Sequence, residues 1–253
     1  MINVLINGCN GKMGQEVSRL IEKSENMKTV CGVDKQNKEN TRYIVYENPN
    51  NIKEKIDVII DFSIPYATFK ILEYAKENKI PVVIATTGFS KKEEQKIMEY
   101  AKYIPIFKSA NMSFSINLFQ KILEQIAPKL KDTDIEIIET HHNRKIDSPS
   151  GTANMLANTI NTSLGGEYKF EYDRHSKHEP RGKKEIGITS IRGGNIVGEH
   201  TVKFFGEFET FEIKHTSYSR NVFAEGAIKA AEFLVKQDKG LYNMDNLFEA
   251  QKC

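Results

Sequence analysis

Short apolar runs alternate with amphipathic stretches through the first part of the chain. The runs have strand length and lie at residues 2–6, 29–33, 57–62, 81–86 and 104–107. The stretches between them carry apolar side chains at helical spacing and cover residues 15–23, 66–77 and 91–102. Strands that alternate with helices in this way build a parallel sheet covered by helices. We therefore expect an α/β domain here.

The pattern changes beyond the last of these runs. A long helical stretch covers residues 113–130, a strand follows at residues 134–140, and another helix is expected to begin at Ser150. Beyond a polar loop at residues 174–184, β-rich runs follow one another at hairpin spacing, at residues 186–191, 195–205 and 210–215. This spacing predicts a second α/β domain with a mainly antiparallel sheet. A last helix is expected over residues 221–237, which are apolar on one face.

The composition is that of an ordinary globular protein. Of 253 residues, 39% are apolar and 28% are charged, which argues against disordered, collagen-like and coiled-coil chains. The apolar runs are far shorter than the ~18 residues that a membrane span needs. A net charge of +2 gives no field that would attract nucleic acid or a lipid surface. No signal-peptide pattern opens the chain, so a cytoplasmic location is expected.

Metal and disulfide sites are not predicted. Cys9, Cys31 and Cys253 are odd in number and far apart in the sequence, so we expect free thiols. The adjacent His141 and His142 resemble a pair of metal ligands, but no further cysteine, histidine or carboxylate lies nearby at ligand spacing.

A glycine-rich turn at residues 8–14 follows the first expected strand and opens the first expected helix. Glycines allow a tight turn and a close backbone approach, so that helix amides can face a pyrophosphate. Asp34 ends the second strand 20 residues beyond Gly14, where a carboxylate would accept hydrogen bonds from an adenosine ribose. The turn therefore predicts a dinucleotide site, and the alternative is a plain glycine-rich turn with no ligand.

Lys35 follows Asp34 directly. A cation at this position can pair with the 2′-phosphate that Asp34 alone would repel, which predicts use of both NADH and NADPH. The alternative interpretation of Lys35 is a solvated surface lysine.

The residues richest in chemistry are those at 139–153. Two imidazoles at the end of a strand offer a proton near neutral pH, and Lys145 offers a fixed positive charge. Ser150 is expected to cap the next helix, whose first residues, Gly151 and Thr152, would present amides to a carboxylate. Together they indicate a site for a small anionic substrate that is protonated during the reaction. The alternative is a polar surface loop with incidental histidines.

At this point the sequence resembles the 4-hydroxy-tetrahydrodipicolinate (dihydrodipicolinate) reductase family over essentially its whole length. The most specific match is the string His-His-x-x-Lys-x-Asp-x-Pro-Ser-Gly-Thr-Ala at residues 141–153. Further matches lie at residues 8–14, 61–63, 85–89, 109–112, 192–200 and 219–227. Ala85 stands where the family usually has glycine, and Ser148 where it usually has alanine.

The resemblance implies reduction of 4-hydroxy-tetrahydrodipicolinate to tetrahydrodipicolinate, with loss of water, in lysine and diaminopimelate biosynthesis. It implies that His141 is the general acid and that Lys145 is a second catalytic or substrate-anchoring group. His142, Gly151 and Thr152 would bind the substrate carboxylates. NADH or NADPH would supply the hydride. Their contacts would fall on Gly8, Cys9, Asn10, Gly11, Lys12, Met13, Asp34, Lys35, Ala85, Thr86, Thr87, Ser109, Ala110, Asn111 and Met112.

The resemblance also implies a domain plan. A Rossmann-like dinucleotide-binding domain would cover residues 1–110, and a substrate-binding and oligomerisation domain residues 111–220. Residues 221–253 would form a C-terminal helix that returns to the first domain, and the protein would be a homotetramer. Two other functions fit the residues alone: another NAD(P)-dependent dehydrogenase of a small carboxylate, or a non-catalytic regulator that senses NAD(P)H.

Overall fold

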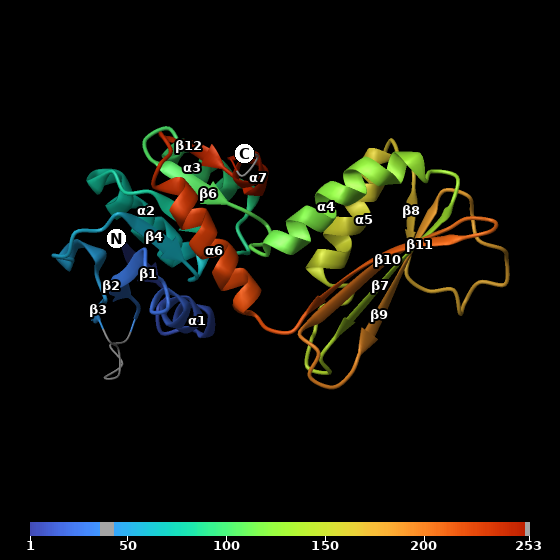
Figure 1. Ribbon diagram of the computed structural model, residues 1–253, viewed down its shortest axis with the longest axis horizontal. Helices are drawn as coiled ribbons and strands as arrows, with labels where there is room; N and C mark the ends of the chain where they lie inside the picture. The colour runs from blue at the N-terminus through green and yellow to red at the C-terminus, as the bar shows by residue number, and fades with distance from the viewer. Residues whose placement is uncertain (36–42, 251–253) are drawn as a thin grey trace. The chain divides into compact units, whose positions relative to one another are not determined.

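The computed structural model describes residues 1–35 and 43–250, and it divides into two compact units (Figure 1). The first unit combines residues 1–114 with residues 221–253, and the second is the continuous stretch between them. The second unit is therefore inserted into the first. Within the described residues, no helix is long and apolar enough to cross a bilayer.

The first unit is built on a parallel sheet of seven strands; the alternating pattern predicted a parallel sheet and five of these strands, but not those at residues 44–46 and 240–242. Its order is β12-β6-β5-β4-β1-β2-β3, and every pairing is parallel. The strands are β1 (Ile2–Asn7), β2 (Met27–Val33), β3 (Ile44–Tyr46), β4 (Val58–Asp61), β5 (Val82–Ile84), β6 (Pro105–Lys108) and β12 (Gly240–Tyr242). The helices are α1 (Lys12–Ile21), α2 (Pro65–Asn78), α3 (Lys91–Tyr100), α6 (Asn221–Leu234) and α7 (Met244–Ala250), with a 3-10 turn at Pro49–Asn51.

Both faces of this sheet are covered. Alternate residues of a strand point to opposite faces, so Val4 and Ile6 of β1 pack with α1, α6 and α7, while Leu5 packs with α2 and α3. These two apolar layers form the core of the unit. The strand runs are almost entirely apolar because neither face of the sheet meets water.

Helix α6 lies very close to the segment that follows β6. Apart from Leu234, its buried positions are alanine or glycine, among them Ala224, Gly226 and Ala227. A Cβ atom added to Gly226 would lie 1.6 Å from the carbonyl oxygen of Met112. Only glycine at this position lets the helix backbone approach residue 112 so closely.

The second unit has a five-stranded mixed sheet, so the prediction of a mainly antiparallel sheet was wrong. Its order is β11-β10-β7-β9-β8. The β11–β10 and β10–β7 pairings are antiparallel, whereas β7–β9 and β9–β8 are parallel. The strands are β7 (Asp134–His141), β8 (Lys169–Glu171), β9 (Glu185–Arg192), β10 (Gly198–Phe205) and β11 (Thr210–Ser217).

The error has a physical cause. β9 and β10 follow each other at hairpin spacing, but β7 lies between them, so they do not pair. Their connection instead crosses the end of β7, where Gly193 N–H donates to the His141 carbonyl and His142 N–H donates to the Ile196 carbonyl. Spacing along the chain gives no information about a strand inserted from elsewhere.

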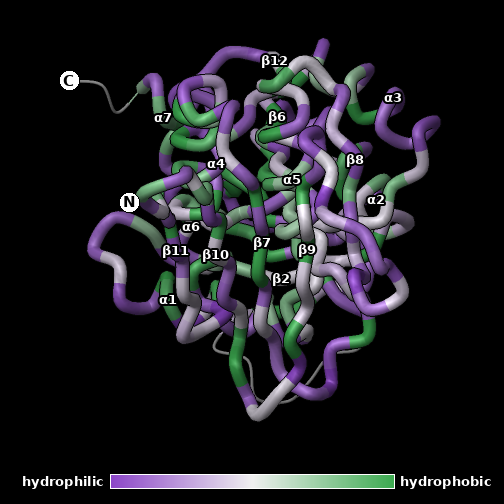
Figure 2. The backbone as a smooth tube through the Cα atoms, turned by 90° about the vertical axis from the view of Figure 1, so that its right-hand side faces the viewer, coloured by the Kyte–Doolittle hydropathy of each residue, from purple (hydrophilic) through white to green (hydrophobic). Residues whose placement is uncertain are grey.

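Helices α4 (Phe114–Ile126) and α5 (Gly151–Ser163) contribute to the core of the second unit. The long helix expected at residues 113–130 ends early in a 3-10 turn, Ala127–Lys129, because Pro128 has no N–H to donate. Along β7, whose place in the hydropathy-coloured chain is labelled in Figure 2, buried and less buried positions alternate. Ile135, Ile137, Glu139 and His141 therefore share the inner face.

Candidate active site

The expected cofactor residues of the first unit lie along one edge of its sheet. The segments that follow neighbouring parallel strands all begin at the same edge of the sheet. Here this edge bears residues 8–14, Asp34, residues 85–87 and residues 109–112. The strand order reverses at β1, with β2 and β3 on one side and β4, β5 and β6 on the other. Open α/β sheets bind ligands at such a switch point.

The glycine turn has the geometry that a pyrophosphate needs. Gly8 has φ +79°, and a Cβ added to it would lie 2.6 Å from the Phe62 carbonyl oxygen. A Cβ on Gly14 would lie 2.3 Å from the Gly8 carbonyl oxygen. The turn and α1 therefore approach each other more closely than any residue with a Cβ atom would allow. The capping residue of α1, Gly11, offers no side-chain cap. The amides at the start of this helix can therefore face an anion, and the turn fits a dinucleotide.

The cysteine in this turn is not a reactive group. Cys9 is buried, and burial raises the pKa of its thiol to about 12, with the charge of Asp34 adding to the effect. Cys31 is also a buried free thiol, and burial again raises its pKa to about 12. Cys253 lies outside the described residues. Within the described ranges, no three His, Cys, Asp or Glu side chains gather as metal ligands would.

A cavity of about 560 Å³ opens beside the turn. Asp34 and Lys35 line it together with Lys70 of α2. The Asp34 carboxylate accepts a hydrogen bond from the Asn10 amide at 2.9 Å and one from the Lys35 amide at 2.7 Å. One oxygen of Asp34 therefore accepts a hydrogen bond that stabilises the turn. The ribose contact expected from the sequence would be a further interaction of the same carboxylate.

The segments after β5 and β6 are held by local hydrogen bonds. Thr86 is buried, and its hydroxyl donates to Asp61 at 3.0 Å, whereas Thr87 is exposed. The Ser109 hydroxyl donates to the Asn111 carbonyl at 2.8 Å, and the Asn111 side chain accepts from the Ser113 amide at 2.8 Å. The backbone at this end of the edge is thus fixed in shape.

Asp61 was not predicted as a site residue. Its carboxylate is fully buried and accepts hydrogen bonds from Asn7, Ser63, Thr68 and Thr86, which join the ends of β1, β4 and β5. Burial raises the pKa of this carboxyl, and the hydrogen bonds oppose the shift. The network stabilises the edge at which the cofactor residues lie.

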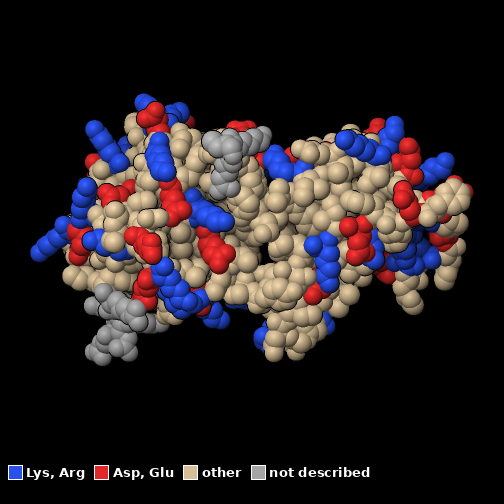
Figure 3. Space-filling view, in the orientation of Figure 1, with Lys and Arg blue, Asp and Glu red and all other residues tan. Residues whose placement is uncertain are grey.

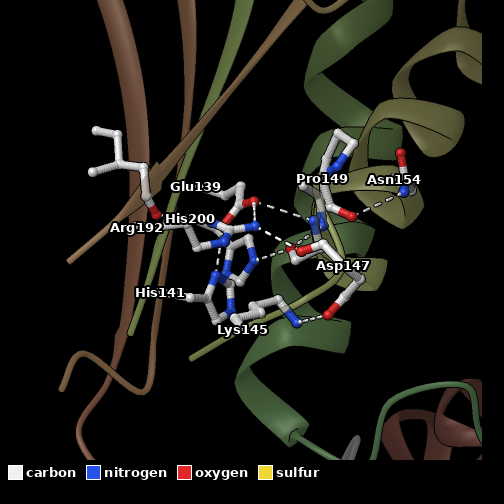
Figure 4. Close-up of polar contacts among 11 residues, drawn as sticks. Glu139, His141, Lys145, Asp147, Pro149, Asn154, Arg192 and His200 are labelled. Atoms are coloured by element: carbon white, nitrogen blue, oxygen red, sulfur yellow. Dashed lines mark hydrogen bonds and ion pairs between the residues drawn. The ribbon is translucent and has the colours of Figure 1, made fainter. Parts of the chain in front are cut away.

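The proton donor expected from the sequence lies in the second unit, at the end of β7 (Figure 4). His141 is buried, and its Nδ1 lies 2.5 Å from Oε2 of Glu139. Burial lowers the pKa of His141, and the Glu139 carboxylate opposes this effect. The imidazole is therefore a titratable group whose Nδ1 is committed to a carboxylate.

Lys145 lies in the loop that follows. Its ammonium group donates to the Asp147 carboxylate at 2.8 Å, and its side chain is mostly buried. This ion pair lowers the pKa of Asp147. The neighbouring His142 has a buried Nδ1 with no partner among the described residues. His142 and Lys145 thus provide polar groups at the same loop as His141.

The expected helix start is confirmed. Ser150 caps α5 and accepts from the Ala153 amide at 3.1 Å, so α5 begins with Gly151 and Thr152. A Cβ on Gly151 would meet nothing within 4 Å. The amino end of α5 is therefore an accessible place for a carboxylate.

The sequence analysis missed Glu139, Arg192 and His200 as site residues. Glu139 lies two residues before His141, and the period of a strand places them on one face, so a signal was present. Arg192 bonds Glu139 from β9, and His200 of β10 lies 2.9 Å from the Ser150 hydroxyl. These two contacts depend on strand pairing, which the local sequence does not reveal.

Two family models match the chain in succession. The model for the N-terminus of dihydrodipicolinate reductase covers residues 2–112, and the model for its C-terminus covers residues 115–248. The chain belongs to the dihydrodipicolinate reductase family. This is a family of NAD(P)H-dependent oxidoreductases, and the N-terminal match contains the dinucleotide-binding domain.

Relatives within the reductase family match over the full length. The 4-hydroxy-tetrahydrodipicolinate reductase of Clostridium novyi (strain NT) is 46% identical, over 99% of this chain and 100% of the relative. The enzyme of the same name from Clostridium tetani (strain Massachusetts / E88) is 48% identical, over 97% of this chain and 96% of the relative.

A solved structure of a reductase agrees with this membership. Dipicolinate-bound dihydrodipicolinate reductase from Paenisporosarcina sp. TG-14 has a TM-score of 0.82 and 28% identity, and the match covers 97% of this chain and 99% of that one. A probable dehydrogenase from Thermotoga maritima, with a TM-score of 0.61 and 10% identity over 98% of this chain and 93% of that one, shares the fold alone.

Proposed function

We propose that this reductase-family chain converts 4-hydroxy-tetrahydrodipicolinate to tetrahydrodipicolinate, with loss of water, for lysine and diaminopimelate biosynthesis. The observation that carries the proposal is the segment with His141, His142 and Lys145, here called the histidine–lysine loop, which leads into the start of α5. It lies in the part of the chain that the family's C-terminal model matches. The named activity of relatives that match from end to end supports it. A non-catalytic regulator would not need this combination of a buried proton donor and an anion site.

The site residues divide the work. Lys145, His142 and the amides of Gly151 and Thr152 bind the substrate carboxylates and orient the ring. Loss of the 4-hydroxyl group as water leaves a conjugated imine, and NADH or NADPH, when bound, would supply the hydride that reduces it. The ring atom that becomes electron-rich then receives a proton from Nε2 of His141, the nitrogen that Glu139 leaves available.

The proposed division of labour follows the units. Residues 1–110 hold the cofactor, residues 111–220 hold the substrate, and residues 221–253 complete the first unit. The glycine turn, residues 85–87 and residues 109–112 would contact the cofactor. Their common position at the carboxyl edge of one sheet supports this assignment.

A tetramer in the cytoplasm completes the proposal. The outer face of the second sheet bears Ile138, Ile191 and Phe205, opposite the face that forms the core. An uncovered sheet face with apolar side chains is suited to association with another copy. On the face drawn in Figure 3, basic and acidic side chains are interspersed, which fits a small-molecule enzyme better than a nucleic-acid binder. Analytical ultracentrifugation tests the assembly.

The reaction itself can be tested directly. The substrate is made in place by dihydrodipicolinate synthase from pyruvate and aspartate semialdehyde, and loss of nicotinamide absorbance is followed. Oxidation of NADH or NADPH should require the synthase product. Cofactor binding without turnover would contradict the proposal and favour the sensor, whereas turnover of another small carboxylate instead would favour a different dehydrogenase.

Use of both cofactors is the first specific prediction. Asp34 suits the ribose hydroxyl of NADH and Lys35 suits the 2′-phosphate of NADPH, so kcat/KM should differ by less than about a hundredfold between them. Lys35→Ala should weaken NADPH binding and leave NADH binding nearly unchanged. Lys131→Ala, at an exposed position in the second unit, is the control. A larger preference for either cofactor would contradict dual use.

Lys145→Ala is expected to raise KM for the substrate by about tenfold or more and to lower kcat, because a charge-assisted hydrogen bond contributes about 1.5–3 kcal/mol. Steady-state kinetics at saturating cofactor measure both effects. Lys131→Ala again serves as a control, since this residue lies just before the opposite end of β7. Near-native KM in Lys145→Ala would rule out an anchoring role.

A further inference from the structure

Glu139 is a buried carboxylate that bonds to two parts of the candidate site. Its side chain is 0% exposed. Oε2 lies 2.5 Å from Nδ1 of His141, and Oε1 accepts a hydrogen bond from the Ser150 amide at 3.2 Å. One side chain thus contacts both the proposed proton donor and the residue that caps α5.

Arg192 holds this carboxylate in place and compensates its charge. Its two terminal nitrogens donate to the two carboxylate oxygens of Glu139 at 2.9 and 2.6 Å. Nη2 also donates to the Asp147 carbonyl at 2.8 Å, in the loop that carries Lys145. Burial alone would raise the pKa of Glu139, but hydrogen bonds from Arg192, Ser190 and His141 lower it to about 2. The carboxylate is therefore ionised throughout the neutral range.

The bond to Glu139 decides which nitrogen of His141 carries a fixed proton. An ionised carboxylate only accepts hydrogen bonds. Nδ1 of His141 therefore carries a proton and donates a hydrogen bond to Glu139. Nε2 is then the nitrogen that exchanges protons. A Cβ on Gly198 would lie 3.0 Å from this Nε2, so glycine at position 198 leaves room for the ring.

His200 provides a second connection between His141 and the start of α5. The Ser150 hydroxyl caps the helix and lies 2.9 Å from Nε2 of His200. Burial lowers the pKa of His200 to about 3, and the neighbouring His141 contributes, so His200 stays neutral. The rings of His141 and His200 pack edge to face, with 5.2 Å between their centroids.

We propose that Glu139, held by Arg192, is a positioning residue that fixes His141 with Nδ1 protonated and ties it to the start of α5. This proposal rests on the proposed function, because His141 matters only if it delivers the proton. It extends that function by assigning a role to two residues outside the expected set. One carboxylate then sets the geometry of the acid and of the substrate anchor together.

The charged and titratable groups around His141 determine the expected pH behaviour. They are Glu139 on the same strand, Arg192 on β9, His200 on β10 and Lys145 in the following loop. Of these, Glu139 favours the protonated ring, Lys145 and Arg192 oppose it, and His200 is neutral. Removing the Glu139 charge must therefore lower the pKa of His141. A general acid works in its protonated form, so activity is lost at a lower pH.

Glu139→Gln tests the proposal because it keeps the size of the side chain and removes its charge. The midpoint of the His141 titration, followed by NMR without substrate and assigned with His141→Gln, should fall by about one unit or more. The pH above which kcat declines should fall in parallel. Glu167→Gln, which removes an exposed acid that pairs with Lys184 in the same unit, should change neither quantity.

Two outcomes would overturn the inference. An unchanged titration midpoint of His141 in folded Glu139→Gln shows that the Glu139 carboxylate does not control the protonation of His141, whether or not the protein is a reductase. A shifted midpoint with an unshifted kcat profile shows that the contact is structural. If Glu139→Gln does not fold, Glu139→Asp retracts the carboxylate by one carbon and should shift the midpoint in the same direction by less. Failure of the wild-type chain to turn over the substrate bears on the proposed function alone.

Discussion

Replacing His141 with glutamine is expected to lower kcat by about two to four orders of magnitude, the range for loss of a general acid. Glutamine has similar size and can still hydrogen-bond to Glu139, but its amide does not release a proton near neutral pH. The buried position of His141 allows little replacement of its function by bulk water. KM for the substrate should change much less, because the carboxylate contacts belong to other residues.

Assays at saturating cofactor and substrate measure this loss. His175→Gln, at an exposed position in the loop before β9, is the matched control and should behave like the wild type. If kcat of His141→Gln fell less than about threefold, another group would be the acid.

Gly226→Ala is expected to have the largest effect on stability. The added Cβ would lie 1.6 Å from the Met112 carbonyl oxygen, and backbone cannot move aside as a flexible side chain can. Overpacking costs about 1–3 kcal/mol and sometimes more, so the melting temperature should fall by several degrees. Because residues 109–112 are expected to contact the cofactor, KM for NADH and NADPH should rise as well.

Thermal unfolding followed by circular dichroism measures the loss. Gly151→Ala is the control for stability, since its Cβ would meet nothing within 4 Å and alanine favours a helix. Equal melting temperatures of Gly226→Ala and the wild type would show that α6 does not need this close approach.

The parallel sheet of the first unit could be predicted because its signals are local. Five of its strands are short apolar runs, and each of these is followed by a helix or a turn that the sequence marks. The second sheet depends on β7 entering between β9 and β10, a choice made by contacts between distant residues. The strands β3, β8 and β12 are three residues long and, unlike β5, do not lie in a longer apolar run, so they give no pattern.

The candidate site shows the same division. The glycine turn and the histidine–lysine loop are continuous segments, so their chemistry can be read directly from the sequence. Arg192 reaches Glu139 across 53 residues of chain, and Asp61 meets Thr86 across 25. Such partners become visible only when the strands have been paired.

The insertion of the second unit has a consequence for synthesis of the protein. One face of the first sheet is covered by α6, which comes from residues 221–234, and the edge next to β6 is completed by β12. As the chain leaves the ribosome, β1 to β6 emerge long before these covering elements. The inserted unit is continuous and has all its strands available earlier. We therefore expect the inserted unit to finish folding before the unit that contains the N-terminus, reversing the usual N-terminal-first order.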